Sequence, residues 1–351
     1  MGNLFVSNRG NGTVSVIRPD SLVSTLATMG AGSSSVATSP DFSRLYVVNS
    51  ASNTVSVFSL VNGALLRQFS VGQNPVDIAI SSEGNYGYVL NRGSGTVTPF
   101  NLIFYNLLND IPIESGALSI KLSPNNQVVY IAYDTEIIVY NANLTNIITR
   151  HPVRGARFME LTPDGNKLVC TNADRSSVTL INLPYTTGAT RVERIIRSGP
   201  QGISITKNGL FAYICCTTGN AIQVVGISGD TPILQRVVAP IDSPYDITFD
   251  LNDDFYYVTS PVNNVVYSLS RSGDRLLIYR NNNPTNPFNF STPFNIIITP
   301  DLFSFIPPAL ATDGLALSAT TSSSEQRLIS TNNYPPPYLS RKVRIKKISF
   351  L

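Results

Sequence analysis

The sequence predicts an all-β protein: a seven-bladed β-propeller of four-stranded antiparallel blades, followed by an extended C-terminal arm. Three observations predict this fold. A unit of about 40 residues recurs six times, apolar residues alternate with period two inside each unit, and an incomplete unit is divided between the two ends of the chain. With 351 residues, of which 42% are hydrophobic, the chain is long enough to bury a sizeable core.

The repeated unit is clearest where SPDFSRLYVVNSASNTVSVF, at residues 39–58, returns as SSEGNYGYVLNRGSGTVTPF at residues 81–100. Corresponding positions of successive units lie 42, 42, 39, 44 and 44 residues apart. This period is typical of four-stranded propeller blades, which take roughly 40–50 residues each. The aligned positions are Tyr46, Tyr88, Tyr130, Val169, Tyr213 and Tyr257.

Each unit contains four short runs that we interpret as strands. A first run, such as Val76–Ile80 or Tyr245–Phe249, precedes a turn of the Pro-Asp-Gly type, and a second run ends at Asn or a small residue. A third run, such as Thr54–Phe58, follows a polar turn, and a fourth follows in turn, as in Leu65–Val71 or Gln235–Ala239. Alternation, many Val, Ile, Tyr and Phe residues, and regular turn signals predict antiparallel β structure.

The two ends of the chain supply the seventh blade. Leu4–Asn8 matches a second strand and Thr13–Ile17 a third, whereas Pro293–Asp301 matches a first strand with its turn. We therefore expect a composite blade that closes the ring and leaves no exposed edge at the seam. Leu302–Pro308 is an alternative second strand, and an eight-bladed ring is a less favoured count. The predicted domains are a propeller over residues 1–308 and a Ser/Thr/Pro-rich linker with a basic arm over residues 309–351.

The strand that ends in Asn carries a family resemblance. YVVN at residues 46–49, YVLN at 88–91 and YVTS at 257–260, each after a Pro-Asp-Gly-like turn, resemble the YVTN-type β-propeller repeats. That family includes surface-layer proteins and, more distantly, lactonase-like seven-bladed propellers. The resemblance covers roughly residues 1–301. It implies the fold, and it implies that a lactonase-like member would use His, Arg and Glu side chains around the central channel.

Candidate catalytic residues are few. The chain has one histidine, His151, which we expect in a solvated connection after the third repeat, and there is no G-x-S-x-G nucleophile motif. Cys170, Cys215 and Cys216 fall on second strands, where a free cysteine usually behaves as a small core residue. Asp250 and its acidic neighbours lack the Gly and Glu of a calcium loop, so we interpret them as a turn. The sequence predicts no metal, no cofactor and no enzyme activity, with a lactonase-like hydrolase as the alternative.

The propeller geometry predicts one set of channel residues. The position five residues before the turn proline should point to the central channel in every blade. Most of the side chains at this position are small and polar, and we expect them to cap the turns and line a water-filled channel; binding of a cation or a sugar is the alternative. The channel-rim candidates are Ser35, Asp77, Ser119, Asp246 and Asn295, with Phe158 and Gly202 at the two remaining positions.

The C-terminal arm differs from the propeller in charge. The net charge is +3 for the whole chain but −2 for residues 1–340, because five basic residues and no acidic ones lie beyond. A near-neutral body without a basic stripe argues against nucleic-acid binding by the propeller. The arm could bind partners through a PPxY sequence or through a basic strand that adds to a sheet edge. The arm candidates are Pro335, Pro336, Pro337, Tyr338, Arg341, Lys342, Arg344, Lys346 and Lys347.

Together these features favour a non-enzymatic structural or interaction protein, a subunit of a larger assembly anchored to other subunits through its C-terminal arm. A virion component, such as a phage capsid or tail protein, is the favoured setting, because a charge-poor surface is combined with no visible secretory signal. A surface or spore-appendage adhesin that binds a glycan or a protein is the alternative. No apolar run is long enough to predict a membrane-spanning helix.

Overall fold

The computed structural model describes residues 2–19, 23–26, 32–183, 191–272, 275–280 and 292–300. All of them belong to the unit formed by Met1–Pro308. The predicted linker and basic arm, residues 309–351, lie outside the described residues, as does the alternative second strand Leu302–Pro308. The placement of these segments therefore stays a prediction.

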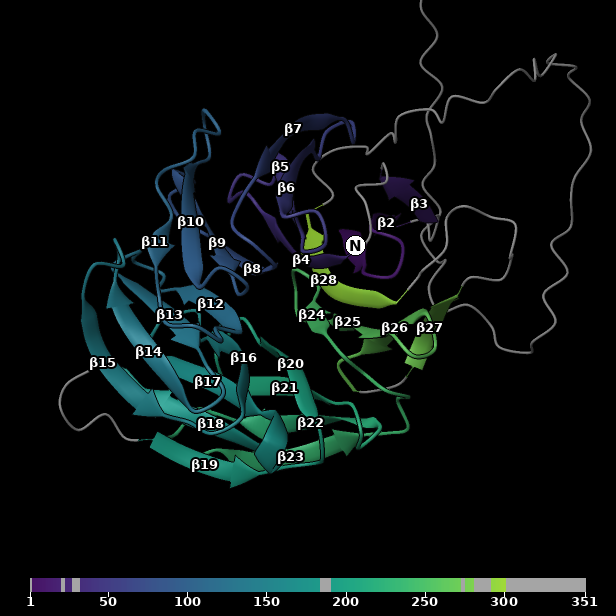
Figure 1. The fold of residues 1–351 in the computed structure, drawn as a ribbon. Helices are drawn as coiled ribbons and strands as arrows, with labels where there is room; N and C mark the ends of the chain where they lie inside the picture. The colour runs from purple at the N-terminus through teal and green to yellow at the C-terminus, as the bar shows by residue number, and fades with distance from the viewer. Residues whose placement is uncertain are drawn as a thin grey trace, which may run out of the picture. The chain divides into compact units, whose positions relative to one another are not determined.

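The described residues form seven four-stranded antiparallel sheets, which confirms the predicted fold class. Each sheet is one blade, and we number the blades in chain order (Figure 1). Blades 1 to 3 contain β4 (Ser33–Thr38), β5 (Arg44–Asn49), β6 (Thr54–Ser59) and β7 (Leu65–Ser70); β8 (Pro75–Ile80), β9 (Tyr86–Asn91), β10 (Thr96–Asn101) and β11 (Ile111–Pro112); and β12 (Ser119–Leu122), β13 (Val128–Ala132), β14 (Glu136–Asn141) and β15 (Ile147–Pro152).

Blades 4 to 6 repeat this order from the inner to the outer strand. Their strands are β16 (Ala156–Leu161), β17 (Lys167–Asn172), β18 (Ser177–Asn182) and β19 (Arg191–Ile195); β20 (Pro200–Ile205), β21 (Phe211–Cys216), β22 (Ala221–Gly226) and β23 (Ile233–Val238); and β24 (Ile247–Phe249), β25 (Phe255–Ser260), β26 (Val265–Ser270) and β27 (Arg275–Arg280). A single 3-10 turn, Ala173–Arg175, interrupts the strands of the described chain.

Blade 7 is the composite that the sequence predicted. Its order is β28 (Pro293–Thr299), β1 (Asn3–Asn8), β2 (Thr13–Ile17) and β3 (Val23–Leu26). β28 pairs with β1 in an antiparallel register that sets Leu4 opposite Ile298 and Val6 opposite Ile296. The two ends of the propeller are thus held by one backbone ladder, and Leu4–Asn8 occupies the second-strand position.

The innermost strands of neighbouring blades contact one another in sequence, from β4 through β8, β12, β16, β20 and β24 to β28 and back to β4. They surround the central axis, and the fourth strands lie at the outside (Figure 1). Apolar residues of the second and third strands fill the space between blades. One such cluster joins Tyr46 and Val55 of blade 1 to Val89 and Phe100 of blade 2.

A hydroxyl or carboxyl group organises each turn between a first and a second strand. In blade 1, the Ser39 Oγ accepts a hydrogen bond of 3.0 Å from the Arg44 amide. In blade 6, Asp250 takes the same place and its Oδ1 accepts from the amides of Asp254 and Phe255. The acidic cluster at Asp250 is therefore a turn, as the sequence analysis expected.

The Asn that ends the second strand in four blades explains the Asn of the repeat motif. Its Nδ2 donates to the hydroxyl groups five and seven residues later, on the third strand. In blade 2, Asn91 donates to Thr96 at 3.1 Å and to Thr98 at 2.7 Å. The equivalent side chains are Asn8, Asn49 and Asn172. Each buried Asn side chain ties the turn that follows it to its own blade, so we call this interaction the asparagine clamp.

The three cysteines are free and fully buried. Cys215 and Cys216 point to opposite faces of β21, because they belong to two different core clusters. Burial raises the pKa of all three thiols. None of the helices in the described part of the chain is long and apolar enough to cross a membrane.

We expect Asn91→Ala to lower the free energy of unfolding by about 1–3 kcal/mol, because the buried Thr98 hydroxyl and the partly buried Thr96 hydroxyl lose their donor. Urea unfolding followed by circular dichroism measures the change. Asn146→Ala is the matched control, since this exposed amide makes only a 3.4 Å contact with its neighbour Thr145. Equal effects of the two substitutions would contradict a structural role for the clamp.

Candidate ligand-binding site in the central channel

The first strands place the predicted rim residues around the channel. Most of these strands contain a register shift at or beside the rim position, as between Ser33 and Ser35 and between Pro75 and Asp77. Such a bulge re-aims the side chain at that position. In blade 6 the irregular stretch is longer, so β24 begins at Ile247 and not at Tyr245 as the sequence predicted.

Asp77 joins three blades through one carboxylate. Its Oδ1 accepts from Ser35 Oγ of blade 1 at 2.9 Å, and its Oδ2 accepts from Ser119 Oγ of blade 3 at 3.0 Å. The amides of Ile78 and Ile120 also donate to this carboxylate. Three of the five rim candidates therefore lie together, in a hydrogen-bonded group that spans blades 1 to 3.

Asp246 and Asn295 form the second group. Asn295 Nδ2 donates to Asp246 Oδ2 at 2.7 Å, and the Ile296 amide donates to the same oxygen at 3.1 Å. The Asn295 Oδ1 accepts from the Val36 amide of blade 1 at 3.0 Å. This group thus connects blades 6, 7 and 1, and the two groups meet at blade 1.

Burial raises the pKa of Asp246 to about 7, although amide donors and Lys121 partly oppose the rise. The side chain is only 7% exposed. The neighbouring rim position, Gly202, has no room for a side chain, because a Cβ there would lie 2.4 Å from the Asp246 Oδ1. The glycine at this position therefore makes room for the buried carboxyl group.

One end of the channel opens into a hollow of about 150 Å³ that three arginines line. Arg9 follows β1, Arg92 follows β9 and Arg157 lies in β16, so they come from blades 7, 2 and 4. All three side chains are exposed. Among the described residues, no carboxylate forms an ion pair with any of them. We call this hollow the arginine mouth.

Aromatic rings line one side of the arginine mouth. The Tyr245 and Phe294 ring centroids are 4.4 Å apart, and Phe158 packs edge-on against Tyr245. The Arg9 guanidinium lies 5.0 Å from the Phe294 centroid, a cation–π distance. Burial raises the pKa of Tyr245, and nearby Arg157 and Arg9 oppose that rise.

A second hollow, of about 440 Å³, includes residues further along the inner strands. Phe158 and Asn295 line both hollows, so they mark the narrow part of the channel between them. Lys121 and Glu160 form an ion pair of 2.8 Å here, with side chains 36% and 33% exposed. Burial disfavours the Lys121 charge, but Glu160, Asp77 and Asp246 outweigh it and raise the pKa to about 12. We call this the lower hollow.

The expected position of His151 is wrong. The residue lies within β15, the outer strand of blade 3, where it pairs with Ile137, and it is buried rather than solvated. Burial and nearby Arg191 lower the pKa of its imidazole. The rim carboxylates Asp77 and Asp246 lie at the inner strands, so His151 on an outer strand cannot act together with them. A hydrolase that needs His151 beside a rim carboxylate is therefore excluded.

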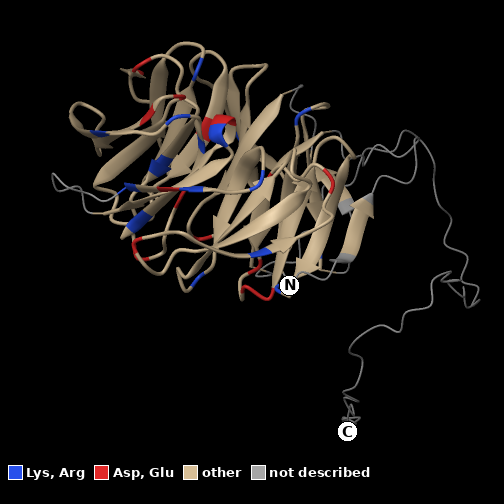
Figure 2. Ribbon diagram, turned by 90° about the horizontal axis from the view of Figure 1, so that it is seen from below, with Lys and Arg blue, Asp and Glu red and all other residues tan. Residues whose placement is uncertain are grey.

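The sequence analysis missed the arginine mouth, although a signal was present. Arg9 and Arg92 stand at the same position of their units, each between the Asn of the clamp and a Gly. Elsewhere the charged residues are scattered over the blades in the view of Figure 2, without a basic stripe. Among the described residues, no cluster of His, Cys, Asp or Glu could hold a metal ion.

No protein-family model and no curated protein sequence matches the chain. Solved structures match its fold. The periplasmic gluconolactonase of Pseudomonas aeruginosa aligns with a TM-score of 0.69 and 16% identity over 85% of this chain and 98% of that one. A putative 6-phosphogluconolactonase from Bacteroides fragilis gives 0.68 and 15% over 85% and 98%. Hydrazine synthase of Kuenenia stuttgartiensis gives 0.69 and 17% over 78% and 93%.

These similarities establish the seven-bladed propeller and nothing finer, because proteins with different activities share it at low identity. The fold that the YVTN-type resemblance implied is confirmed. Membership of that family stays a prediction, since no family model matches the chain.

The raised pKa of Asp246 predicts a pH-dependent stability. Between about pH 4, the ordinary pKa of an aspartate, and about pH 7, Asp246 is protonated in the folded protein and ionised in the unfolded chain. The contribution of Asp246 to the free energy of unfolding therefore falls as the pH rises through this window. Above pH 7 it is constant. Asp246→Asn has no such dependence. We expect its stability relative to the native chain to rise from pH 4 to pH 8, by at most about 4 kcal/mol, in urea titrations. A difference that does not change with pH would contradict the raised pKa.

Proposed function

We propose that the protein is a non-enzymatic interaction propeller that recognises an anionic group at the arginine mouth. One observation carries the proposal: three exposed guanidinium groups from three blades line one hollow and none forms an ion pair with a described carboxylate. Asp77 also lines this hollow, but its carboxylate already accepts four hydrogen bonds from its own chain. Like charges repel one another, and a bound anion removes that cost. Planar guanidinium groups also match carboxylate, sulfate and phosphate oxygens in geometry.

The aromatic side of the mouth adds selectivity. Tyr245 and Phe294 offer a flat apolar surface beside the arginines, and Ser34, Ser50 and Asn74 line the same hollow with polar groups. A sugar ring that carries an acidic group satisfies both parts of the site, because its C–H face can pack on the aromatic rings while its acidic group pairs with the arginines. An acidic side chain of a partner protein would use the arginines alone.

A hydrolase similar to the lactonases of the same fold has less support. The Asp77 carboxylate already accepts four hydrogen bonds from its own chain, and Asp246 is held between Asn295 and a backbone amide. These carboxylates therefore act as acceptors that join blades. His151, the residue on which the hydrolase alternative depended, lies on an outer strand.

Titration of the protein with inorganic phosphate at low salt tests the arginine mouth. We expect saturable binding that weakens with added salt, and a loss of at least about tenfold in affinity for Arg92→Ala or Arg157→Ala, because each removes a charge-assisted hydrogen bond. Arg194→Ala, an exposed arginine on the outer strand β19, is the matched control. Phosphate binding that all three variants retain would contradict the site.

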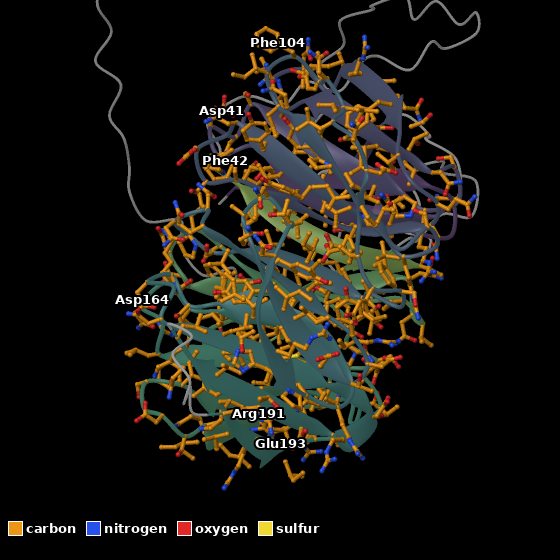
Figure 3. The ribbon with its side chains drawn as sticks, turned by 60° about the vertical axis from the view of Figure 1, so that its left-hand side comes forward. Asp41, Phe42, Phe104, Asp164, Arg191 and Glu193 are labelled. Atoms are coloured by element: carbon orange, nitrogen blue, oxygen red, sulfur yellow. The ribbon has the colours of Figure 1, made fainter. Side chains whose placement is uncertain are left out.

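A role as a subunit of a larger assembly is a second candidate, favoured by an exposed apolar turn after β10. Phe104 is 70% exposed and Ile103 is 55% exposed. Phe104 lies at the edge of the molecule in Figure 3. Asn101 stabilises the turn, since the amides of Ile103 and Phe104 both donate to its Oδ1 at 2.9 Å. Exposed apolar groups on a rigid turn are typical of protein–protein contacts.

In this second candidate the C-terminal arm supplies the anchor, and a virion component is the favoured setting. Light scattering of the full chain and of a chain that ends at Thr331 tests the arm. We expect the native mass to fall from oligomer to monomer on truncation, while circular dichroism stays unchanged. Phe104→Ser tests the apolar turn in the same assay. An oligomer that survives both changes would contradict this candidate.

A further inference from the structure

The lower hollow is a second cavity of the channel, apart from the arginine mouth. Its volume of about 440 Å³ falls within the range of small-molecule sites, roughly 300–1,000 Å³. The next side chain on the same face of an inner strand stands two positions after the rim residue, because strands alternate with period two. Lys121, Glu160, Ser204 and Thr248 occupy these second positions and line the hollow.

The polar groups of the lower hollow retain capacity for hydrogen bonds. Neither the Ser204 hydroxyl nor the Thr248 hydroxyl makes a hydrogen bond to another described residue, and both side chains are partly exposed. The Lys121 ammonium has three donors and uses one on Glu160 Oε2. Glu160 Oε1 makes no hydrogen bond to a described residue. Donors, acceptors and hydroxyl groups are therefore all available in one hollow.

The charges of the hollow disfavour ionic ligands. Glu160 and Asp246 repel an anion, Lys121 repels a cation, and the charges of Lys121 and Glu160 already neutralise each other in their ion pair. A wholly apolar ligand would leave the ion pair and the hydroxyl groups without partners in a less hydrated space. A neutral ligand with several hydroxyl groups satisfies donors and acceptors together.

The rest of the wall is aliphatic. Leu161, Ile205 and Ile297 line the hollow and are only partly buried. They offer an apolar surface to the C–H face of a ring, as small-molecule sites commonly do around a few polar groups. The arrangement differs from the arginine mouth, where three cations and aromatic rings face the ligand.

We propose that the lower hollow binds a neutral polyhydroxylated ring, a monosaccharide or a cyclic polyol, between the Lys121–Glu160 pair and the hydroxyl groups of Ser204 and Thr248. The aliphatic residues contact the face of the ring. This site takes no part in the recognition of anions and stands whether or not the arginine mouth binds them.

Calorimetric titration of the full chain with D-glucose, D-galactose and myo-inositol tests the proposal. We expect saturable binding of at least one of them at millimolar concentration. The double substitution Ser204→Ala with Thr248→Val should weaken that binding by at least about tenfold, because two hydrogen bonds are lost. Thr149→Val, on the outer strand β15, is the control and should leave the affinity unchanged.

Control measurements distinguish a loss of binding from a loss of folding, and neutral from charged ligands. The melting temperature of the double variant, and its phosphate titration where the native chain binds phosphate, show whether it is folded. D-glucuronate and D-glucosamine carry one charge each on the same ring. The proposal is overturned if no neutral probe binds the native chain, or if the folded double variant binds as tightly as the native chain. It is also overturned if a charged sugar binds the native chain more tightly than the neutral sugars do and the double variant loses affinity for that charged sugar.

Discussion

The seven blades are separate sheets, so no continuous backbone ladder joins one blade to the next. A closed ring therefore requires other interactions between the inner strands. Polar side chains at one structural position supply much of this connection. Asp77 joins blades 1, 2 and 3, and Asp246 with Asn295 joins blades 6, 7 and 1. Because buried acceptors are costly without donors, these groups fix the angle at which the blades meet. The shape of both hollows depends on that angle.

The fold could be predicted well from the sequence because equivalent positions recur in each repeat and can be aligned. The aligned tyrosines marked the second strands, and the incomplete units at the ends predicted the pairing of β1 with β28. The rim residues could be named in advance because each stands at a fixed distance from a turn. Blade 6 departs from the expectation: the Asp246 amide donates to the Thr259 hydroxyl at 3.0 Å, and β24 begins only at Ile247, opposite Val258.

The sites were harder to predict for a physical reason. Arg9, Arg92 and Arg157 are far apart in the chain and meet only because blades 7, 2 and 4 surround one axis. Arg9 and Arg92 share one position of the repeat, directly after the second strand, but Arg157 lies in a first strand. His151 was misplaced because the fourth strands carry the weakest pattern: in β15, exposed Ile147 and Ile148 precede a buried histidine. The arm, residues 309–351, lies outside the described residues, so its role stays a prediction.

The composite blade also sets the order in which the molecule can be completed during synthesis. β1 is translated before the other strands of the propeller, yet its neighbour β28 follows it by almost the whole length of the propeller, as the separation of 288 positions between Ser7 and Asn295 shows. Six blades can form on the growing chain, each from contiguous sequence. The N-terminal hairpin must wait with one edge unpaired until Pro293–Thr299 emerges. Ring closure therefore comes after the other six blades have been translated, and a chain interrupted before β28 leaves an open edge available to other strands.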